Sequence, residues 1–343
     1  MQFLGIEFAP LSLPFERRLQ TLSVLFYVFL FLQGLSLIGF SLFIYLLFTN
    51  YYWISLIYGL WYYLDNDTPY KGGRKFPWSR TWSLWKYFRD YFPIKLVKTA
   101  DLDPNKNYIF GISPHGVMCF SSLINFATDA TNFPDLFPGL EPHLITLNGQ
   151  FFSPLMREFF MLCGSCACEE QSLKYILFNK GQCKQKGQVC ALLVGGARES
   201  NEAYPGTYRL VLKRRKGFIR IALETGASLV PVLTFGENDA YKTVVVKDGS
   251  FIQKVQAFAK RYLNIGLPII TGRGIFNYNF GIMPYRVPMV TIVGKPIEVE
   301  KTENPTEDQI NELQKKYIDD LVNLFETNKD KYLTNKNTNI EIL

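Results

Sequence analysis

One histidine of the chain stands between a proline and a glycine directly after an apolar run, in the sequence FGISPHGVMCF. This residue, His115, is one of only two histidines among 343 residues. It follows a predicted strand and precedes a helix candidate that begins near Val117, and reactive groups of α/β domains gather at the carboxyl ends of strands. A neutral imidazole there could take a proton from an alcohol, or it could only cap the next helix. Gly116 would let another group approach closely, and Pro114 would stiffen the turn.

A second candidate group lies at the end of another predicted strand, in the sequence LLVGGARES. Gly195 and Gly196 leave room for a substrate or a second backbone. Arg198 and Glu199 follow them, and a carboxylate in this place could hold a histidine in the correct tautomer, as the third member of a triad does. Glu199 could equally be a surface carboxylate, because spacing alone does not show whether it reaches His115.

A basic cluster at the start of a predicted helix is the third candidate, in the sequence LKRRKGFIR. Its cations are Lys213, Arg214, Arg215, Lys216 and Arg220. Cationic side chains and the free N–H groups of a helix start suit phosphates, including those of coenzyme A. The alternative is a positive face that rests on anionic lipid headgroups. We expect no nucleic acid partner, because the cluster is isolated.

The composition favours a membrane protein. Hydrophobic residues make up 48% of the chain and charged residues only 20%, and the net charge is +7. No charged residue occurs between Arg18 and Asp65. As a helix this stretch would extend roughly 69 Å, enough to cross a bilayer core of about 30 Å twice as a hairpin. A hairpin that enters the membrane without crossing it fits the pattern too. Basic residues flank both sides of it, so the positive-inside rule places both ends in the cytosol.

All five tryptophans lie between Trp53 and Trp85. Aromatic residues at 78–92 alternate with basic ones such as Arg80 and Arg89. This mixture suits the headgroup layer of a membrane, where rings lie at the interface and charges reach water. We therefore expect residues 65–95 to lie on the membrane surface.

From about residue 96 the pattern is that of an α/β domain. Short β-rich runs alternate with helical ones, which indicates a parallel or mixed sheet flanked by helices. The expected strands cover 107–112, 143–147, 189–196, 228–236 and 289–299. The expected helices are Leu155–Cys163, Ser172–Asn179, Lys216–Glu224, Ser250–Leu263 and an amphipathic helix at 304–332 that Thr306 caps. The whole chain is thus divided into an N-terminal segment (1–20), a membrane hairpin of two helices (21–64), the interfacial segment (65–95), the α/β domain (96–332) and a loose tail (333–343).

Six cysteines are scattered along the chain, and three of them form the sequence CGSCAC at 163–168. A metal site would need a fourth ligand at a suitable spacing, and no histidine is nearby. We expect reduced, buried or half-buried thiols and no metal site.

Several ordered blocks resemble the family of acyl-CoA:diacylglycerol acyltransferase 2 and monoacylglycerol acyltransferases. The amino-terminal block IEFAPLSLPFERRLQTLSVL looks like that of animal monoacylglycerol enzymes, and YFRDYFPIKLVKT contains the family's YFP sequence. Later blocks that match are RKGFIRIALETGASLVPVLTFGEND, GRGIFNYNFGIMPYR and TIVGKPIEV. The family's HPHG sequence aligns with 113–116, and its GGxxE sequence aligns with 195–199.

The resemblance implies a glycerolipid acyltransferase α/β domain anchored in the endoplasmic reticulum membrane, with a further location at lipid droplets. It implies acyl transfer from acyl-CoA to a hydroxyl of diacylglycerol. Acyl-CoA is then a co-substrate, and no cofactor is expected. The partners expected are acyl-CoA, mono- or diacylglycerol, membrane lipids and, in an oligomer, further copies of the chain. His115 and Glu199 are the implied catalytic residues. The substrate-binding residues expected are Ser113, Pro114, Gly116, Gly195, Gly196, Arg198, Arg215, Lys216 and Arg220.

Two positions depart from the family pattern. Ser113 stands where the first histidine of HPHG is expected, and Thr271 replaces a common histidine before the GRG sequence. These changes leave open a second class of function, a non-catalytic lipid-binding relative. Within the enzyme class the acceptor is also open, since monoacylglycerol or a long-chain alcohol would suit the same blocks. The remaining histidine, His143, lies at a predicted strand start, where we expect a structural role.

Overall fold

A seven-stranded mixed sheet forms the centre of the computed structural model, which describes residues 2–3, 5–10, 12–178, 187–244, 246, 250–258, 261, 266 and 268–343. The strands lie in the order β3-β12-β9-β4-β7-β5-β6. All neighbours run parallel except β12 and β9, which are antiparallel. In that order the strands are β3 (Lys95–Lys98), β12 (Val290–Val293), β9 (Ser228–Phe235), β4 (Tyr108–Ser113), β7 (Gln188–Leu193), β5 (Glu141–Thr146) and β6 (Cys166–Ala167).

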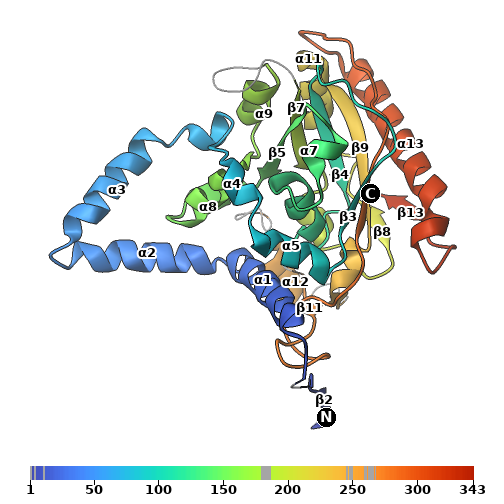
Figure 1. The fold of residues 1–343 in the computed structure, drawn as a ribbon. Helices are drawn as coiled ribbons and strands as arrows, with labels where there is room; N and C mark the ends of the chain where they lie inside the picture. Colours follow the sequence, from blue (N-terminus) through green and yellow to red (C-terminus); the bar gives the residue numbers. More distant parts are fainter. Residues whose placement is uncertain are drawn as a thin grey trace.

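Helices cover both faces of this sheet (Figure 1). Side chains alternate along β4, so that Phe110 and Ile112 enter one buried apolar cluster and Ile109 enters the other. The first cluster includes residues of α1 (Phe15–Phe31), α5 (Ser83–Tyr91) and α8 (Met156–Leu162). The second includes residues of α9 (Glu170–Leu177), α11 (Gly217–Thr225) and α13 (Glu307–Tyr332).

The expected α/β domain is confirmed, with small differences in the bounds of its elements. The helix expected near residue 117 begins at Phe120 as α6 (Phe120–Ser122) and continues as a π-helical turn, Leu123–Ala127. The strand expected at 289–299 is β12, which ends at Val293, and Ile297 then forms an isolated bridge with Leu229. Thr306 forms the expected cap with Gln309 at the start of α13. Of the expected helix at 250–263 the structure has α12 (Phe251–Phe258), and parts of 259–263 and Asn179 lie outside the described residues.

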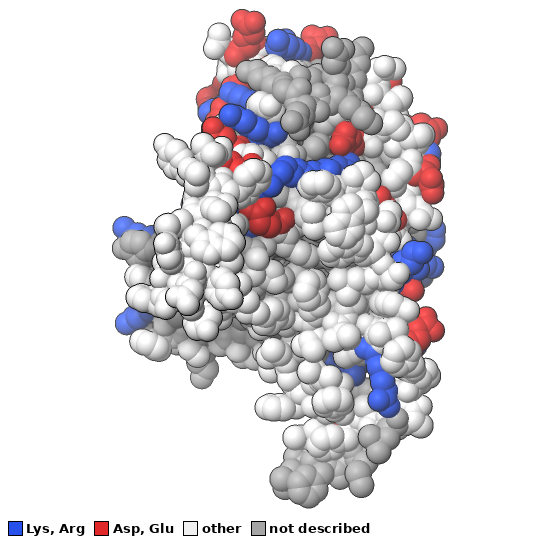
Figure 2. All heavy atoms as spheres, turned by 60° about the vertical axis from the view of Figure 1, so that its left-hand side comes forward, with Lys and Arg blue, Asp and Glu red and all other residues white. Residues whose placement is uncertain are grey.

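The uncharged stretch divides into three helices rather than two. The carboxyl-terminal half of α1 packs one face against the domain through Val24, Tyr27, Val28 and Leu30, so this helix joins the core and is not part of a separate hairpin. Then α2 (Gly34–Leu47) and α3 (Tyr52–Leu64) form a hairpin that projects away from the sheet (Figure 1). Most of its large apolar side chains are exposed, and the surrounding face carries few charges (Figure 2).

By length and hydropathy, no single helix in the described part of the chain suffices to cross a membrane. The consecutive helices α1 and α2 meet that criterion only as a pair, and they are bent by 63° at the break between them. The hairpin's insertion into a membrane therefore stays a prediction.

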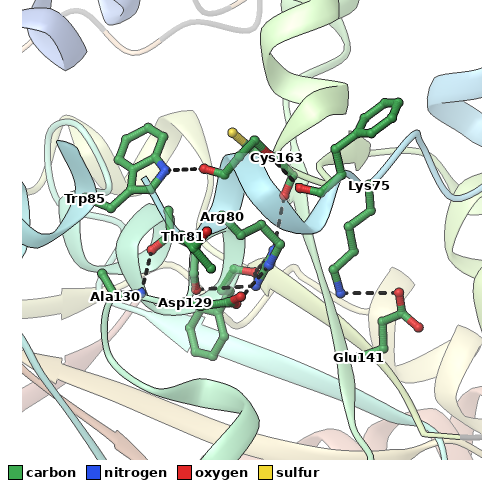
Figure 3. Close-up of polar contacts among 12 residues, drawn as sticks. Lys75, Arg80, Thr81, Trp85, Asp129, Ala130, Glu141 and Cys163 are labelled. Atoms are coloured by element: carbon green, nitrogen blue, oxygen red, sulfur yellow. Dashed lines mark hydrogen bonds and ion pairs between the residues drawn. The ribbon is translucent and has the colours of Figure 1, made fainter. Parts of the chain in front are cut away.

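The aromatic segment at 78–92 is largely part of the core, contrary to its expected place on the membrane surface. Trp85, Phe88, Tyr91 and Phe92 are fully buried, and only Trp78 of the tryptophans at 78–85 is strongly exposed. Arg80 ties this segment to the domain, and its side chain is only 2% exposed (Figure 3). It pairs with Asp129 at 2.9 Å and donates to the carbonyl oxygens of Phe126, Thr128 and Cys163.

Replacing Arg80 with alanine should destabilise the fold strongly. Removing Arg80 leaves the half-buried carboxylate of Asp129 without its partner and buried carbonyl groups without their donor, and each unsatisfied buried group typically costs roughly 1–3 kcal/mol. The expected result is a large drop in the midpoint of urea unfolding of the detergent-solubilised protein. Lys98→Ala is the matched control, because its ion pair with exposed Asp101 lies at the surface and should leave the midpoint nearly unchanged. Equal midpoints for the two variants would contradict the structural role of Arg80.

The carboxyl-terminal tail is ordered, although we expected it to be loose. Residues of β13 (Ile340–Ile342) pair in parallel with β8 (Tyr208–Leu210). Leu343 extends this pairing, since its N–H donates to Leu210 and its carbonyl oxygen accepts from Leu212 and Lys213. The tail therefore holds the chain that leads into the basic cluster.

The remaining short elements connect these layers. They are β1 (Gln2–Phe3), β2 (Ile6–Glu7), α4 (Pro77–Arg80), α7 (Phe133–Leu136), α10 (Ala197–Ser200), β10 (Lys242–Thr243), β11 (Ile270–Thr271) and the 3-10 turns Thr68–Tyr70, Asn148–Phe151 and Glu237–Ala240.

Candidate active site

Three parallel strands of the sheet end side by side, and each is followed by a candidate site residue. In the register of the sheet, Ile112 of β4 lies beside Leu193 of β7, and Ser113 lies beside Leu233 of β9. His115 follows β4, Glu199 follows β7 and Glu237 follows β9. The carboxyl edge of the sheet thus brings together residues that lie far apart in the sequence.

His115 is half-buried, and its imidazole is oriented by its own turn. Its Nδ1 lies 3.0 Å from the carbonyl oxygen of Gly116. A carbonyl oxygen only accepts, so this contact places the proton on Nδ1 and the lone pair on Nε2. The thiol of Cys119 lies 3.4 Å from Nδ1 and 3.5 Å from Nε2.

The pKa of His115 is lowered from its ordinary value of 6.5. Burial is the main cause, because it disfavours the charged imidazolium. The Gly116 carbonyl opposes this shift, and the positive charge of Arg215 adds to it. The ring is therefore neutral at neutral pH and available as a base.

Glu199 reaches His115, but it contacts the main chain and not the ring. Its Oε1 accepts the backbone N–H of His115 at 2.6 Å, and its Oε2 accepts the backbone N–H of Val211 at 2.8 Å. The expectation that Glu199 orients the imidazole, as in a triad, is therefore wrong for this structure. The alternative of a surface carboxylate is also wrong, since Glu199 is 1% exposed and burial raises its pKa to about 7.

The two glycines after β7 are needed for close packing around Glu199 and Arg215. A Cβ atom on Gly195 would lie 2.1 Å from Oε2 of Glu199, and Gly196 has a φ of +58°. Arg215 donates from Nη2 to the carbonyl oxygen of Gly195 at 2.7 Å. The space left by these glycines is filled by side chains of the same domain rather than by a second backbone.

Other members of the predicted binding set lie elsewhere. Lys216 and Arg220 both form ion pairs with Glu307 at the start of α13, at 3.4 and 3.5 Å. Arg198 is exposed. Of the basic residues predicted to bind substrate, only Arg215 is thus placed against the strand ends.

Glu237 was missed by the sequence reasoning. It is 2% exposed and accepts the backbone N–H groups of Phe120 at 2.7 Å and Ser121 at 3.1 Å. A signal for it exists, because Glu237 follows a buried strand and a glycine in the sequence LTFGEND, much as Glu199 follows a strand and a glycine pair.

Residues 44–343 match the family model described as diacylglycerol acyltransferase. The chain belongs to the diacylglycerol acyltransferase family.

Relatives agree with this membership. The chain is 44% identical to human 2-acylglycerol O-acyltransferase 1 over 328 residues, which cover 95% of this chain and 96% of the relative. It is 41% identical to human diacylglycerol O-acyltransferase 2 over 318 residues, which cover 92% of this chain and 81% of the relative. The chain is thus an acyltransferase, as the sequence blocks predict.

A solved structure is also similar. It is the crystal structure of the 1-acyl-sn-glycerophosphate (LPA) acyltransferase PlsC from Thermotoga maritima, with a TM-score of 0.42 and 10% identity. The match covers 92% of this chain and 99% of that one.

The two departures from the family pattern lie in different surroundings. Ser113 ends β4, is fully buried, and its Oγ has no hydrogen-bond partner in the described part of the chain. Pro114 follows it through a cis peptide bond. Thr271 is exposed in β11, where it pairs with Lys242 of β10.

His143 and the cysteines of 163–168 take no part in the contacts of His115, Glu199 and Glu237 described above. His143 is buried within β5 and contacts Gln188 of the neighbouring strand at 2.8 Å, which fits the structural role expected for it. Cys163 and Cys166 are buried, whereas Cys168 is exposed.

Deleting residues 340–343 should lower the rate of this acyltransferase. The tail pairs with the strand that leads to Val211, whose N–H holds Glu199, so its loss should displace the support of His115. We expect kcat to fall by about 10-fold or more, since small misplacements of a reacting group are costly. The readout is acyl transfer per folded protein. Glu341→Gln is the control, because it removes the ion pair with Arg209 but keeps the backbone pairing. A wild-type kcat after the deletion would contradict this support.

Proposed function

We propose that the chain transfers a fatty acyl group from acyl-CoA to the free hydroxyl of diacylglycerol, which gives triacylglycerol. The observation that carries the proposal is the position and state of His115 in a member of the diacylglycerol acyltransferase family. Its ring is neutral, has a free lone pair on Nε2, and lies at the carboxyl ends of neighbouring parallel strands. Such a ring is suited to take a proton from an alcohol.

In the proposed reaction, Nε2 of His115 takes the proton of the acceptor hydroxyl. The hydroxyl oxygen attacks the thioester carbonyl carbon directly, the bond from that carbon to sulfur breaks, and an ester forms. The imidazolium then returns its proton to the departing thiolate of coenzyme A. The mechanism needs no metal and no cofactor beyond the acyl-CoA, because the ring supplies the base and the thioester supplies the activated acyl group.

The other residues of the site position this base or bind the co-substrate. Glu199 fixes the backbone at His115, so its contribution is to position the base. Arg215 is the residue of the basic cluster best placed to meet a phosphate of coenzyme A, since it bonds to Gly195 beside Glu199. Backbone N–H groups near Gly116 are proposed to stabilise the oxyanion that forms during attack.

A second acceptor, 2-monoacylglycerol, is favoured by one observation. The identity to human 2-acylglycerol O-acyltransferase 1 is 44%, against 41% to human diacylglycerol O-acyltransferase 2. The two acceptors differ by one acyl chain, and the chemistry at His115 would be the same for both.

We further propose that the enzyme acts at the endoplasmic reticulum membrane and at lipid droplets, with both termini in the cytosol. The exposed apolar hairpin of α2 and α3 supports this location (Figure 2). Exposed Phe276, Phe280 and Ile282 offer a further apolar contact for the same lipid phase. The acceptor would then diffuse to the site from the membrane.

The test is a transfer assay in microsomes that lack their own triacylglycerol synthesis. Labelled oleoyl-CoA is supplied in parallel with diacylglycerol, 2-monoacylglycerol or hexadecanol. Labelled triacylglycerol as the main product would support the proposal, and labelled diacylglycerol from added monoacylglycerol would favour the second acceptor. No labelled product from folded protein would contradict acyl transfer and leave a lipid-binding relative.

A further inference from the structure

The turn that carries His115 is held at both ends by buried carboxylates from two different strands. Glu199, which follows β7, accepts the N–H of His115 at 2.6 Å. Glu237, which follows β9, accepts the N–H groups of Phe120 and Ser121 at 2.7 and 3.1 Å. The residues between these two anchors include Gly116 and Cys119, which are the ones that contact the imidazole.

Glu237 also packs directly beneath this turn. A Cβ atom added to Gly116 would lie only 2.5 Å from Cγ of Glu237, so the backbone beside His115 rests on this side chain. Gly116 and Cys119 both have positive φ values, +64° and +57°. A non-glycine residue such as Cys119 adopts this conformation only where surrounding contacts impose it.

We propose that Glu237 is a positioning residue for His115: its carboxylate fixes residues 116–121, so that the imidazole keeps its contact with the Gly116 carbonyl and presents Nε2 to the acceptor. The proposal rests on the proposed function, in which His115 is the base. It adds a second anchor beside Glu199, and neither anchor touches the imidazole itself.

The contacts require a carboxylate at this position. Two backbone N–H groups point at two oxygens of one side chain, and the charge lies at the start of the helical run that begins with α6, where a negative group is favourable. A glutamine has one oxygen and one NH2 group, so it would satisfy only one of the two N–H groups and turn a donor toward the other. The turn would have to move to relieve this conflict.

The chain offers a matched control on the same 3-10 turn. Asp239 is also a carboxylate that accepts a backbone N–H, but that N–H belongs to Gly206 at 2.7 Å and not to the His115 turn. Asp239→Asn thus removes the charge of a second carboxylate on the same turn, keeps an oxygen that accepts from Gly206, and does not release residues 116–121.

The experiment compares wild type, Glu237→Gln, Glu237→Asp and Asp239→Asn in the labelled oleoyl-CoA assay, per amount of folded protein. We expect Glu237→Gln to lower kcat by about 10²-fold with little change in KM for oleoyl-CoA, because a misplaced base slows the chemical step. Glu237→Asp, which keeps the charge, should recover part of the rate. Asp239→Asn should remain close to wild type.

A wild-type kcat for Glu237→Gln, or equal losses for Glu237→Gln and Asp239→Asn, would overturn the proposal. If Glu237→Gln does not fold, Glu237→Asp decides: a reduced kcat at unchanged KM supports positioning, and a wild-type kcat overturns it. The proposed function is tested separately by wild type and His115→Ala. If wild type is active, His115→Ala is inactive and Glu237→Gln is fully active, only the role of Glu237 is rejected.

Discussion

His115→Ala should lower kcat for acyl transfer by about 10²–10⁴-fold, the usual loss when a general base is removed. The ring is neutral at neutral pH and carries a basic nitrogen lone pair on Nε2. The backbone N–H of residue 115 remains in the variant, so the bond to Glu199 and the fold of the turn should persist. Initial rates with labelled oleoyl-CoA and the best acceptor measure the effect.

The control for this loss is the second histidine. His143→Gln removes the other imidazole of the chain, which is buried in β5 and bonded to Gln188. It should lower stability but keep the wild-type kcat per folded molecule. Full activity of His115→Ala, or an equal loss of kcat in both variants, would contradict the assignment of His115 as the base.

Glu199→Gln should lower kcat by about 10²-fold although the substitution hardly changes the side-chain volume. The two oxygens of the carboxylate each accept one N–H group, from His115 and Val211, and an amide keeps only one of these oxygens. One buried N–H is left unpaired, which should also lower the free energy of unfolding by about 1–3 kcal/mol. The readouts are kcat per folded protein and the urea unfolding midpoint.

Glu202→Gln serves as the neighbouring control for Glu199. Glu202 is only partly buried and pairs with Arg209, and such ion pairs near the surface contribute little. Its substitution should leave kcat and the midpoint close to wild type. A Glu199→Gln variant with wild-type kcat would show that the backbone bond to His115 is not required for catalysis.

Local patterns were sufficient to predict the strands that build the site. Alternating or continuous apolar runs mark β4, β7 and β9, and the residues that follow a parallel strand lie at one edge of the sheet. This geometry explains why His115 and Glu199 lie together although 84 positions separate them, which their spacing alone did not show. The amphipathic pattern and the Thr306 cap likewise predicted α13.

The contacts of the site depend on tertiary packing and could not be predicted from the sequence. Spacing does not show whether a carboxylate meets a ring or a backbone N–H, and for Glu199 it is the N–H of His115.

The burial of Trp85 could not be predicted either, because its aromatic and basic neighbours are typical of a membrane surface. Arg80 ties its segment to loops at 126–129 and 163, and the indole N–H of Trp85 donates to the Ser79 carbonyl oxygen at 2.7 Å. Pairing of the tail with β8 joins segments more than a hundred residues apart, and no local pattern encodes it.

The most direct test of His115 as the base is the ratio of acyl-transfer rates of wild type and His115→Ala across about pH 5 to 8. Both proteins contain Glu199 and Glu237, whose pKa values are raised by burial to about 7, but these carboxylates hold the turn of His115, so their protonation lowers only the wild-type rate. Because the pKa of His115 is itself lowered from 6.5, the ratio should fall as the pH drops through 7 and should continue to fall below it, as the carboxylates and then the ring gain protons. A ratio that does not change with pH would contradict proton transfer to His115.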